Sequence, residues 1–497
     1  MFPVPSDSIL DHQEIDRPLY FRVDTPYLPS AISTSAYGSL LEAPPTDHPY
    51  RPVQWAVVDR ELTNVVTPTE TFDALNVDPW HEAGFKGQAV KVAVFDVEWQ
   101  GAEWNNGELG TVTTHDCFAH PSCELPIDTL HPRFGFERGV HGVACAEVIA
   151  DIAPEADLHL VRVLGLTSLE NAVDWAIRED VDFISMSLSF FHESFYDGTG
   201  PISILMNKLR EHDIMMVTSA GNYARGHHRT TFEDANRDQF HDFSDPRGLP
   251  IYFTGGRKSV QILWDDFRQC GWNDINAYLW NRNGDIIAKS LLQQSPYIDG
   301  CHPSETITVE LETDQWTFLT LENLGYGTPE IDVMARSGYV YESHRTDAIV
   351  DPGTHPSVLT VGAVRVDNYL QQGLEAFSSI GSTTQAIQKP EIVAPNGLDT
   401  LSYGSKGFFG TSASTPATVG ALALYKNKHP DLDNFALTQQ LIRQAIPDTP
   451  LSYEGSDTYS QYGRLRLPHP EALPTRCAVS PLWLLGIAIF FFHKARR

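Results

Sequence analysis

The sequence predicts an α/β protein with a doubly wound, mostly parallel sheet, helices on both faces of that sheet, and an inserted all-β sandwich. The first observation is the run Val90–Phe95, whose apolar and β-branched residues are typical of a strand covered on both faces. The second is that similar runs alternate with helical patterns, as in doubly wound sheets. The third is that this alternation stops near Ala224 and resumes after Val350.

The elements of the α/β part are expected in the order strand, helix, strand, helix. Further strands are predicted at Leu158–Leu164, Asp182–Leu188, Ile214–Thr218 and Val358–Val364. The helices between them are predicted at His141–Ala150, Ser168–Arg178 and Pro201–His212. Sheets of this kind place their active sites at the carboxyl ends of the strands, so polar residues at those ends are the candidates for function.

A last helix is expected to begin in the turn Gly410–Pro416 and to continue through the apolar segment Ala417–Tyr425. Pro416 is acceptable in a first turn because the N–H that it lacks would have no partner within the helix. Ser412 then lies at the N-terminal end of the helix. An oxyanion formed beside Ser412 would face unpaired backbone N–H groups and the positive end of the helix dipole.

Residues 229–350 are predicted to form the inserted β-sandwich, because short strands recur there at regular spacing. These strands are expected at Ser259–Trp264, Asn276–Trp280, Thr306–Leu311 and Trp316–Glu322. Turn residues such as Asn281–Gly284 separate them. A structural role is expected for this segment in preference to contact with a substrate or matrix.

The composition restricts the classes of function. The chain has 497 residues and a formal net charge of -29, which argues against binding to nucleic acid or to an anionic membrane surface. Its six cysteines are too few for a disulfide scaffold, and none forms a C-x-x-C pair. Cys117 with Cys123, and Cys270 with Cys301, could each close a loop in an oxidising compartment.

Four polar residues combine into a set with an assignable chemistry: Asp96, His141, Asn222 and Ser412. A serine hydroxyl is a poor nucleophile until a base accepts its proton. A histidine does this near neutral pH, and a buried carboxylate fixes the imidazole tautomer and stabilises its cation. Asn222 would donate a side-chain N–H to the oxyanion beside the backbone N–H of Ser412. Each residue alone is weak evidence, whereas the set predicts nucleophilic serine catalysis.

The chain order Asp, His, Ser and the motifs around these residues resemble the subtilisin-like serine peptidases, or subtilases. The motifs are Val92–Asp96, His141-Gly142, Ser219–Asn222 and Gly410–Pro416, with supporting stretches at Ile152–Ala156 and Lys389–Pro395. The resemblance covers roughly residues 78–224 and 351–466. It implies a subtilisin-like fold and an endopeptidase that acts on protein or peptide substrates through an acyl-enzyme.

The resemblance also implies roles for individual residues. Ser412 would be the nucleophile, His141 the general base and then acid, and Asp96 the carboxylate that orients His141. Asn222 would be the oxyanion donor. Substrate binding is implied for an edge segment and for a second segment near it: Ser187, Leu188, Ser189, Ser219, Ala220 and Gly221. Such an edge recognises extended peptide in general by adding a strand.

One departure from the family pattern bears on activity. Val97-Glu98 follows Asp96, where the family usually has Thr-Gly or Ser-Gly. If Glu98 lies on the same strand face as Asp96, a second carboxylate would disfavour ionisation of both. This leaves open an alternative of another class, a surface-displayed binding protein with a catalytically impaired subtilisin-like fold.

No cofactor is expected to be required. Subtilases often bind structural calcium, but the sequence has no EF-hand-like run of ligands, so no metal residue is assigned. His227-His228 has no third ligand at a helical spacing and is expected to be a solvated loop pair.

The domain boundaries are predicted as an N-terminal extension at 1–75, peptidase parts at 76–228 and 351–475, the sandwich at 229–350 and a tail at 476–497. The extension lacks the pattern of a secretory signal, and it is a docking arm, a degenerate propeptide or a disordered leader. The tail has an apolar run, Leu482–Phe492, followed by basic residues, and it resembles bacterial sorting tails, with a buried terminal helix as the alternative. We therefore expect a monomer that is extracytoplasmic, secreted or attached to the cell envelope, with a transmembrane tail.

Overall fold

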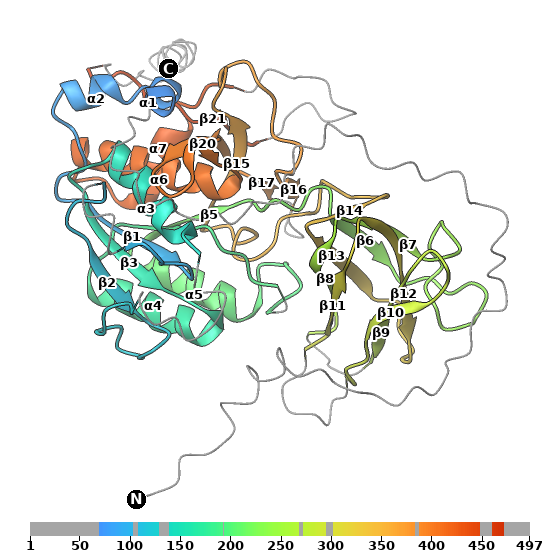
Figure 1. Cartoon of the computed structure of the whole chain (residues 1–497). Coiled ribbons are helices and arrows are strands. Elements are labelled where there is room, and N and C mark those ends of the chain that lie inside the picture. Colours follow the sequence, from blue (N-terminus) through green and yellow to red (C-terminus); the bar gives the residue numbers. More distant parts are fainter. Residues whose placement is uncertain are drawn as a thin grey trace, which may run out of the picture. The chain divides into compact units, whose positions relative to one another are not determined.

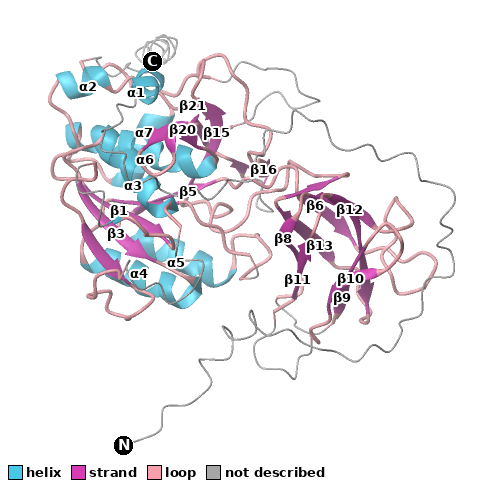
Figure 2. Ribbon diagram, in the orientation of Figure 1, coloured by secondary structure: helices cyan, strands magenta, loops and turns pink. Residues whose placement is uncertain are grey.

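The computed structural model describes residues 69–102, 108–128, 139–191, 193–267, 272–294, 302–382, 387–447 and 460–471. Figure 1 follows the chain from end to end, and Figure 2 shows its secondary structure in the same orientation. Cys270 and Cys301, which could close a loop, and the C-terminal tail lie outside the described residues.

The central sheet has eight strands in the order β2-β3-β1-β4-β5-β15-β18-β21, and all of its strand pairs are parallel. The strands are β1 (Lys91–Asp96), β2 (Thr113–Asp116), β3 (Asp157–Arg162), β4 (Phe183–Met186), β5 (Met215–Ser219), β15 (Leu359–Arg365), β18 (Ile392–Asn396) and β21 (Gly463–Arg464). The α/β prediction is confirmed, and the five strands predicted in this sheet differ from the observed ones by one or two residues at each end.

Helices cover both faces of this sheet (Figure 2). They are α3 (His141–Ile152), α4 (Gly165–Arg178), α5 (Gly200–Glu211), α6 (Thr411–Lys428) and α7 (Asn434–Ile442). Val92 and Val94 of β1 pack in one cluster with α3 and α6, whereas Ala93 and Phe95 pack in a second cluster with α4 and α5. Because both faces are buried, the strand sequence is apolar at successive positions.

Helix α6 brings the serine motif to the carboxyl edge of the sheet. Gly410 precedes the helix with a φ of 107°, a conformation that favours glycine. The prediction that Pro416 lies in the first turn is wrong, because Pro416 lies inside the helix. Since proline lacks the N–H that would bond four residues back, the carbonyl of Ser412 has no helical donor.

Two antiparallel sheets follow between residues 227 and 340. One has the order β10-β9-β12-β7-β14 and the other β11-β8-β13-β6. Their strands are β6 (His227–Thr231), β7 (Leu249–Phe253), β8 (Gly256–Trp264), β9 (Ile275–Trp280), β10 (Ile286–Ser290), β11 (Ser304–Leu311), β12 (Gln315–Asn323), β13 (Glu330–Arg336) and β14 (Gly338–Val340). Buried side chains from both sheets, such as Ile262 and Leu279, share one hydrophobic cluster.

The predicted strands in this segment overlap β8, β9, β11 and β12, whereas β6 is polar and was expected to be a loop. The expectation of a solvated pair at His227-His228 is wrong, since both side chains are buried in β6. The two nitrogens of His227 lie 2.9 Å from Asp332 Oδ2 and 2.7 Å from the carbonyl oxygen of His344. These contacts satisfy the hydrogen-bonding groups of a buried polar side chain.

Short elements complete the described chain. They are α1 (Thr69–Leu75), α2 (Asp78–Glu82), the pair β16 (Gly381–Ser382) and β17 (Gln388–Lys389), and the pair β19 (Leu398–Thr400) and β20 (Gly404–Phe408). Helix α1 lies within the predicted N-terminal extension, yet Leu75 is buried in the same cluster as α3 and α6. The backbone N–H of Leu467 donates to the Leu75 carbonyl at 2.9 Å. Residues from Thr69 onward therefore contribute to the core of the α/β part.

The structure does not support the expectation of a transmembrane segment. Within the described ranges, every helix is too short or too polar to cross a bilayer.

Candidate active site

Asp96 and His141 form a hydrogen-bonded pair at the carboxyl end of β1. Asp96 is the last residue of β1 and is 1% exposed, and His141 is the first residue of α3. Asp96 Oδ2 lies 2.7 Å from His141 Nδ1, while Asp96 Oδ1 accepts the N–H groups of Val97 and Glu98. The carboxylate is thus held by the turn that follows its strand. This fixes its second oxygen against the imidazole.

The pair changes the basicity of His141. Burial alone would lower the pKa of His141, but the charge of Asp96 and the hydrogen bond that Asp96 accepts from His141 outweigh burial and raise this pKa to about 8. With Nδ1 bonded to Asp96, Nε2 is the ring nitrogen left to exchange a proton with another group. His141 can therefore act as a general base, and its neutral form predominates above about pH 8.

Asn222 and Ser412 meet at the start of α6. The side-chain oxygen of Asn222 accepts the backbone N–H of Thr411 at 3.0 Å and the hydroxyl of Thr411 at 3.1 Å. This assigns the amide orientation and leaves the Asn222 NH2 group without an acceptor among the described residues. The backbone N–H of Ser412 likewise has no acceptor there. Two N–H donors are thus open beside the serine, at the positive end of a long helix.

The main chain of Ser412 is held by groups from two other elements. Its carbonyl, which Pro416 leaves without a helical donor, accepts the Ser187 hydroxyl at 3.1 Å and the Cys145 thiol at 3.7 Å. Cys145 lies one turn after His141 on α3, and the ligand atoms of Asp96, His141 and Cys145 lie within 4.8 Å of one another. The described hydrogen bonds do not include one between Ser412 Oγ and His141 Nε2. Catalytic hydrogen bonds often close only when substrate binds.

Cys145 contacts the Ser412 carbonyl and was not among the residues predicted from the sequence. Its thiol is buried, and burial raises its pKa well above the usual value. A neutral thiol is a weak donor, which suits its place against the Ser412 carbonyl. The four-residue spacing from His141 on a helix could have indicated that both side chains face the same way.

The two segments predicted to bind substrate differ in their backbone hydrogen bonding. Ser187, Leu188 and Ser189 follow β4, and their backbone N–H and C=O groups make no hydrogen bond to a described residue. The backbone of the other segment, 219–221, is hydrogen-bonded to neighbouring residues. The N–H of Ala220 donates to the Val361 carbonyl, and the N–H of Gly221 donates to the Thr411 hydroxyl. Ser187–Ser189 is therefore the segment whose backbone groups are free to pair with a peptide.

Glu98 lies outside β1, because the strand ends at Asp96 and the chain turns there. Its carboxylate lies 3.4 Å from the backbone N–H of His141, and its carbonyl accepts the N–H of Gly142 at 3.0 Å. A side chain at position 139 would have no room, because a Cβ on Gly139 would lie 1.7 Å from the Glu98 carboxylate. Glu98 thus caps the start of α3, where Val140 offers no side-chain cap.

Glu98 also titrates in the range where His141 does. Burial raises the pKa of Glu98 to about 7, and the charge of Asp96 adds to this, while the charge of His141 opposes it. Its charge in turn contributes to the raised pKa of His141. Glu98→Gln should therefore lower the pKa of His141 and move the acid limb of kcat/KM to lower pH, as measured by a pH-rate profile. An acid limb that stays in place or moves upward would contradict this role.

Within the described ranges, Asp96, His141 and Cys145 are the only group of three side chains with the geometry of a metal site. Because the first two already bond to each other, a metal is not needed to explain their placement. Structural calcium therefore stays a prediction without assigned ligands.

The sequence of this chain matches the subtilase family over residues 132–255 and 332–464, just over half of its length. The matched ranges contain His141, Asn222 and Ser412, whereas Asp96 precedes them. Pyrolysin from Pyrococcus furiosus is 26% identical over 181 residues, which are 33% of this chain and 13% of pyrolysin. An intracellular serine protease from Paenibacillus polymyxa is 36% identical over 112 residues, 21% of this chain and 31% of that protein.

Among solved structures, the CspB protease of Clostridium perfringens resembles this fold with a TM-score of 0.54 and 14% identity. That likeness covers 81% of this chain and 98% of the CspB chain. The chain spans no more than about a third of the length of the two sequence relatives. The family is established by the domain match, which covers just over half of this chain. This chain belongs to the subtilase family.

Proposed function

We propose that this protein is a serine endopeptidase that cleaves peptide bonds of protein substrates through an acyl-enzyme. The observation that carries the proposal is the 2.7 Å contact between Asp96 and His141, next to a helix start where Ser412 N–H and the Asn222 amide are both open donors. An impaired binding protein, the alternative considered from sequence, would not need a base paired in this way.

In the proposed mechanism, Ser412 Oγ attacks the carbonyl carbon of the scissile bond while His141 Nε2 accepts its proton. Asp96 keeps Nδ1 protonated and stabilises the imidazolium that forms. His141 then returns the proton to the leaving amine, which gives the acyl-enzyme. Water repeats these steps with His141 as base, and this releases the carboxylate product and restores Ser412.

The oxyanion is proposed to bind between Ser412 N–H and the Asn222 side chain. Both donors are fixed before substrate arrives, since Asn222 is anchored by Thr411 and the N–H of Ser412 is set by the helix. Asn222→Ala should lower kcat by about 10²–10³ with little change in KM, as measured on a peptide substrate. Asn427→Ala, which changes an asparagine near the other end of α6, should leave kcat near that of the wild type.

Substrate is proposed to pair with the free edge at Ser187–Ser189. Ser187 contacts the Ser412 carbonyl, so this end of the edge lies next to the nucleophile. Main-chain pairing binds extended peptide of many sequences and leaves selectivity to side-chain pockets. The expected substrates are therefore unfolded or loop segments of proteins.

Two further proposals concern the β-rich segment and the location of the protein. The two antiparallel sheets at 227–340 are proposed to be an inserted β-sandwich with a structural role, supported by their shared cluster. An extracytoplasmic location is proposed because the Cys117–Cys123 disulfide suits an oxidising compartment. Attachment to the envelope through residues 476–497 and a monomeric state stay predictions from sequence.

Covalent labelling with a fluorophosphonate probe tests the proposed activity directly. The probe should label the folded protein, and peptide mass mapping should place the adduct on Ser412, because only an activated serine reacts at an appreciable rate. Heat-denatured protein is the control and should stay unlabelled. A folded protein that remains unlabelled, also after removal of the residues before Thr69, would refute the proposal.

A further inference from the structure

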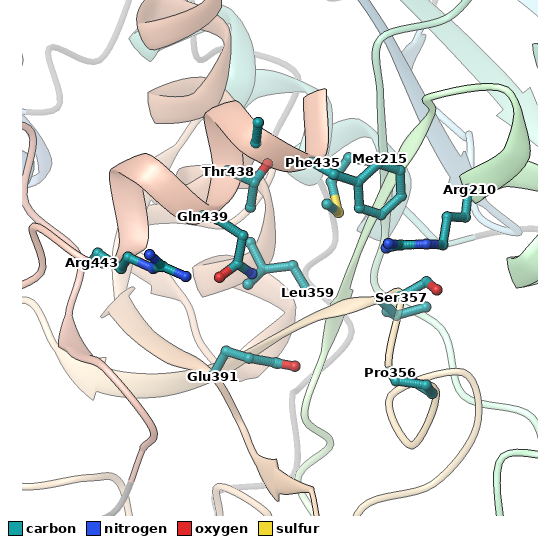
Figure 3. A pocket seen from close by; sticks show the side chains of 12 residues that line it. Arg210, Met215, Pro356, Ser357, Leu359, Glu391, Phe435, Thr438, Gln439 and Arg443 are labelled. Atoms are coloured by element: carbon teal, nitrogen blue, oxygen red, sulfur yellow. The ribbon is translucent and has the colours of Figure 1, made fainter. Parts of the chain in front are cut away.

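A pocket lies at the opposite end of the sheet from Ser412. Its volume is about 400 Å³, and it lies where β5 and β15 begin, at Met215 and Leu359. Helices α5 and α7 supply its walls (Figure 3). Strand β5 begins at this pocket and ends at Ser219, near Asn222, so its two ends lie at different sites. The size is within the range of small-molecule sites.

Two arginines enter this pocket from opposite sides, as Figure 3 shows. Arg210 comes from the last turn of α5, and its guanidinium stacks on the ring of Phe435 with 4.8 Å to the centroid. Arg443 follows the last residue of α7. Neither guanidinium forms an ion pair with a described residue, although the chain carries a net charge of -29. Both arginine side chains are exposed, so their charges are available to a ligand that enters the pocket.

The one carboxylate in the lining does not neutralise these arginines. Glu391 Oε1 lies 2.6 Å from the buried Lys389 ammonium, and Glu391 Oε2 accepts the N–H of Thr360. Lys389 also donates to the carbonyls of His355 and Val358. Burial together with the charges of Lys389 and Arg210 lowers the pKa of His355 to about 4, which agrees with a positive potential here.

Six of the twelve residues that line the pocket are apolar. Met215 and Leu359 lie between the two guanidinium groups in Figure 3, and Gln439 offers an amide. We propose that this pocket binds a small organic dianion, with two carboxylate groups joined by a short apolar chain. One carboxylate would bond to Arg210 and the other to Arg443, since guanidinium groups pair with carboxylates in a two-point geometry. This proposal does not depend on the peptidase activity.

Isothermal titration of the full chain with suberate and with octanoate tests the proposal. The two probes have the same carbon count and differ in one carboxylate. Suberate should bind at least about tenfold more tightly than octanoate, because losing one charge-assisted contact costs about that factor. Arg210→Gln and Arg443→Gln should each reduce suberate affinity to that of octanoate. Thermal melting of each variant checks that it is folded.

Lys208→Gln provides the matched control. Lys208 lies on α5, two residues before Arg210, but it is paired with Asp174 and does not line the pocket. Suberate affinity should not change in this variant if binding is specific to the pocket. Equal affinity for suberate and octanoate, suberate binding that survives both arginine substitutions, or no binding of suberate would each overturn the proposal.

Discussion

Replacement of Ser412 by alanine is expected to lower kcat by about 10⁶ and to abolish fluorophosphonate labelling, because serine and histidine act as a unit. The protein should stay folded. The Ser412 hydroxyl makes no hydrogen bond to a described residue, and the contacts of its carbonyl with Ser187 and Cys145 do not involve the side chain that is removed. Hydrolysis of a peptide substrate, followed together with thermal melting, measures both expectations.

Ser414→Ala is the matched control for this substitution. Ser414 lies on the same helix, but its hydroxyl is buried and donates to the Ala394 carbonyl at 3.0 Å. Its loss should reduce stability by about 1 kcal/mol while labelling of the folded protein persists. Cleavage that survives in Ser412→Ala, or labelling that is lost in folded Ser414→Ala, would refute the assignment of the nucleophile.

The strands and the position of the site could be predicted because they follow from local patterns. Val90–Phe95 is apolar because both faces of β1 are covered, and a polar residue at the end of such a strand lies at the functional edge of the sheet. The sequence could therefore place Asp96 at this edge of the sheet. Its partner His141 could be identified because it opens a helix and matches a family motif.

Other features could not be predicted because they depend on contacts between distant segments. Strand β6 is polar, and its two histidines are buried only because residues 332–344 supply partners. Glu98 could not be recognised as a helix cap, since capping usually comes from the preceding residue and not from a turn more than forty positions away. The pocket arginines lie on helices far apart in sequence, so only the fold brings them together.

Replacement of Asp96 by asparagine is expected to lower kcat by about 10⁴ with little change in KM. The asparagine oxygen can still accept the N–H groups of Val97 and Glu98, so the turn is retained. Its NH2 group would then face His141 Nδ1 and stabilise the tautomer whose Nε2 carries the proton. That tautomer cannot accept a proton from Ser412. Kinetics on a peptide substrate measure the loss.

The pH dependence separates this role of Asp96 from a merely structural one. In the wild type, His141 must be neutral to act, so kcat/KM should rise with pH through about 8. Without the charge of Asp96 the pKa of His141 falls, so the residual activity of Asp96→Asn should reach its plateau at lower pH. A variant with reduced kcat but an unchanged acid limb would indicate that Asp96 acts only by supporting the fold. The opposite shift, to higher pH, would exclude Asp96 as the carboxylate that raises the pKa of His141.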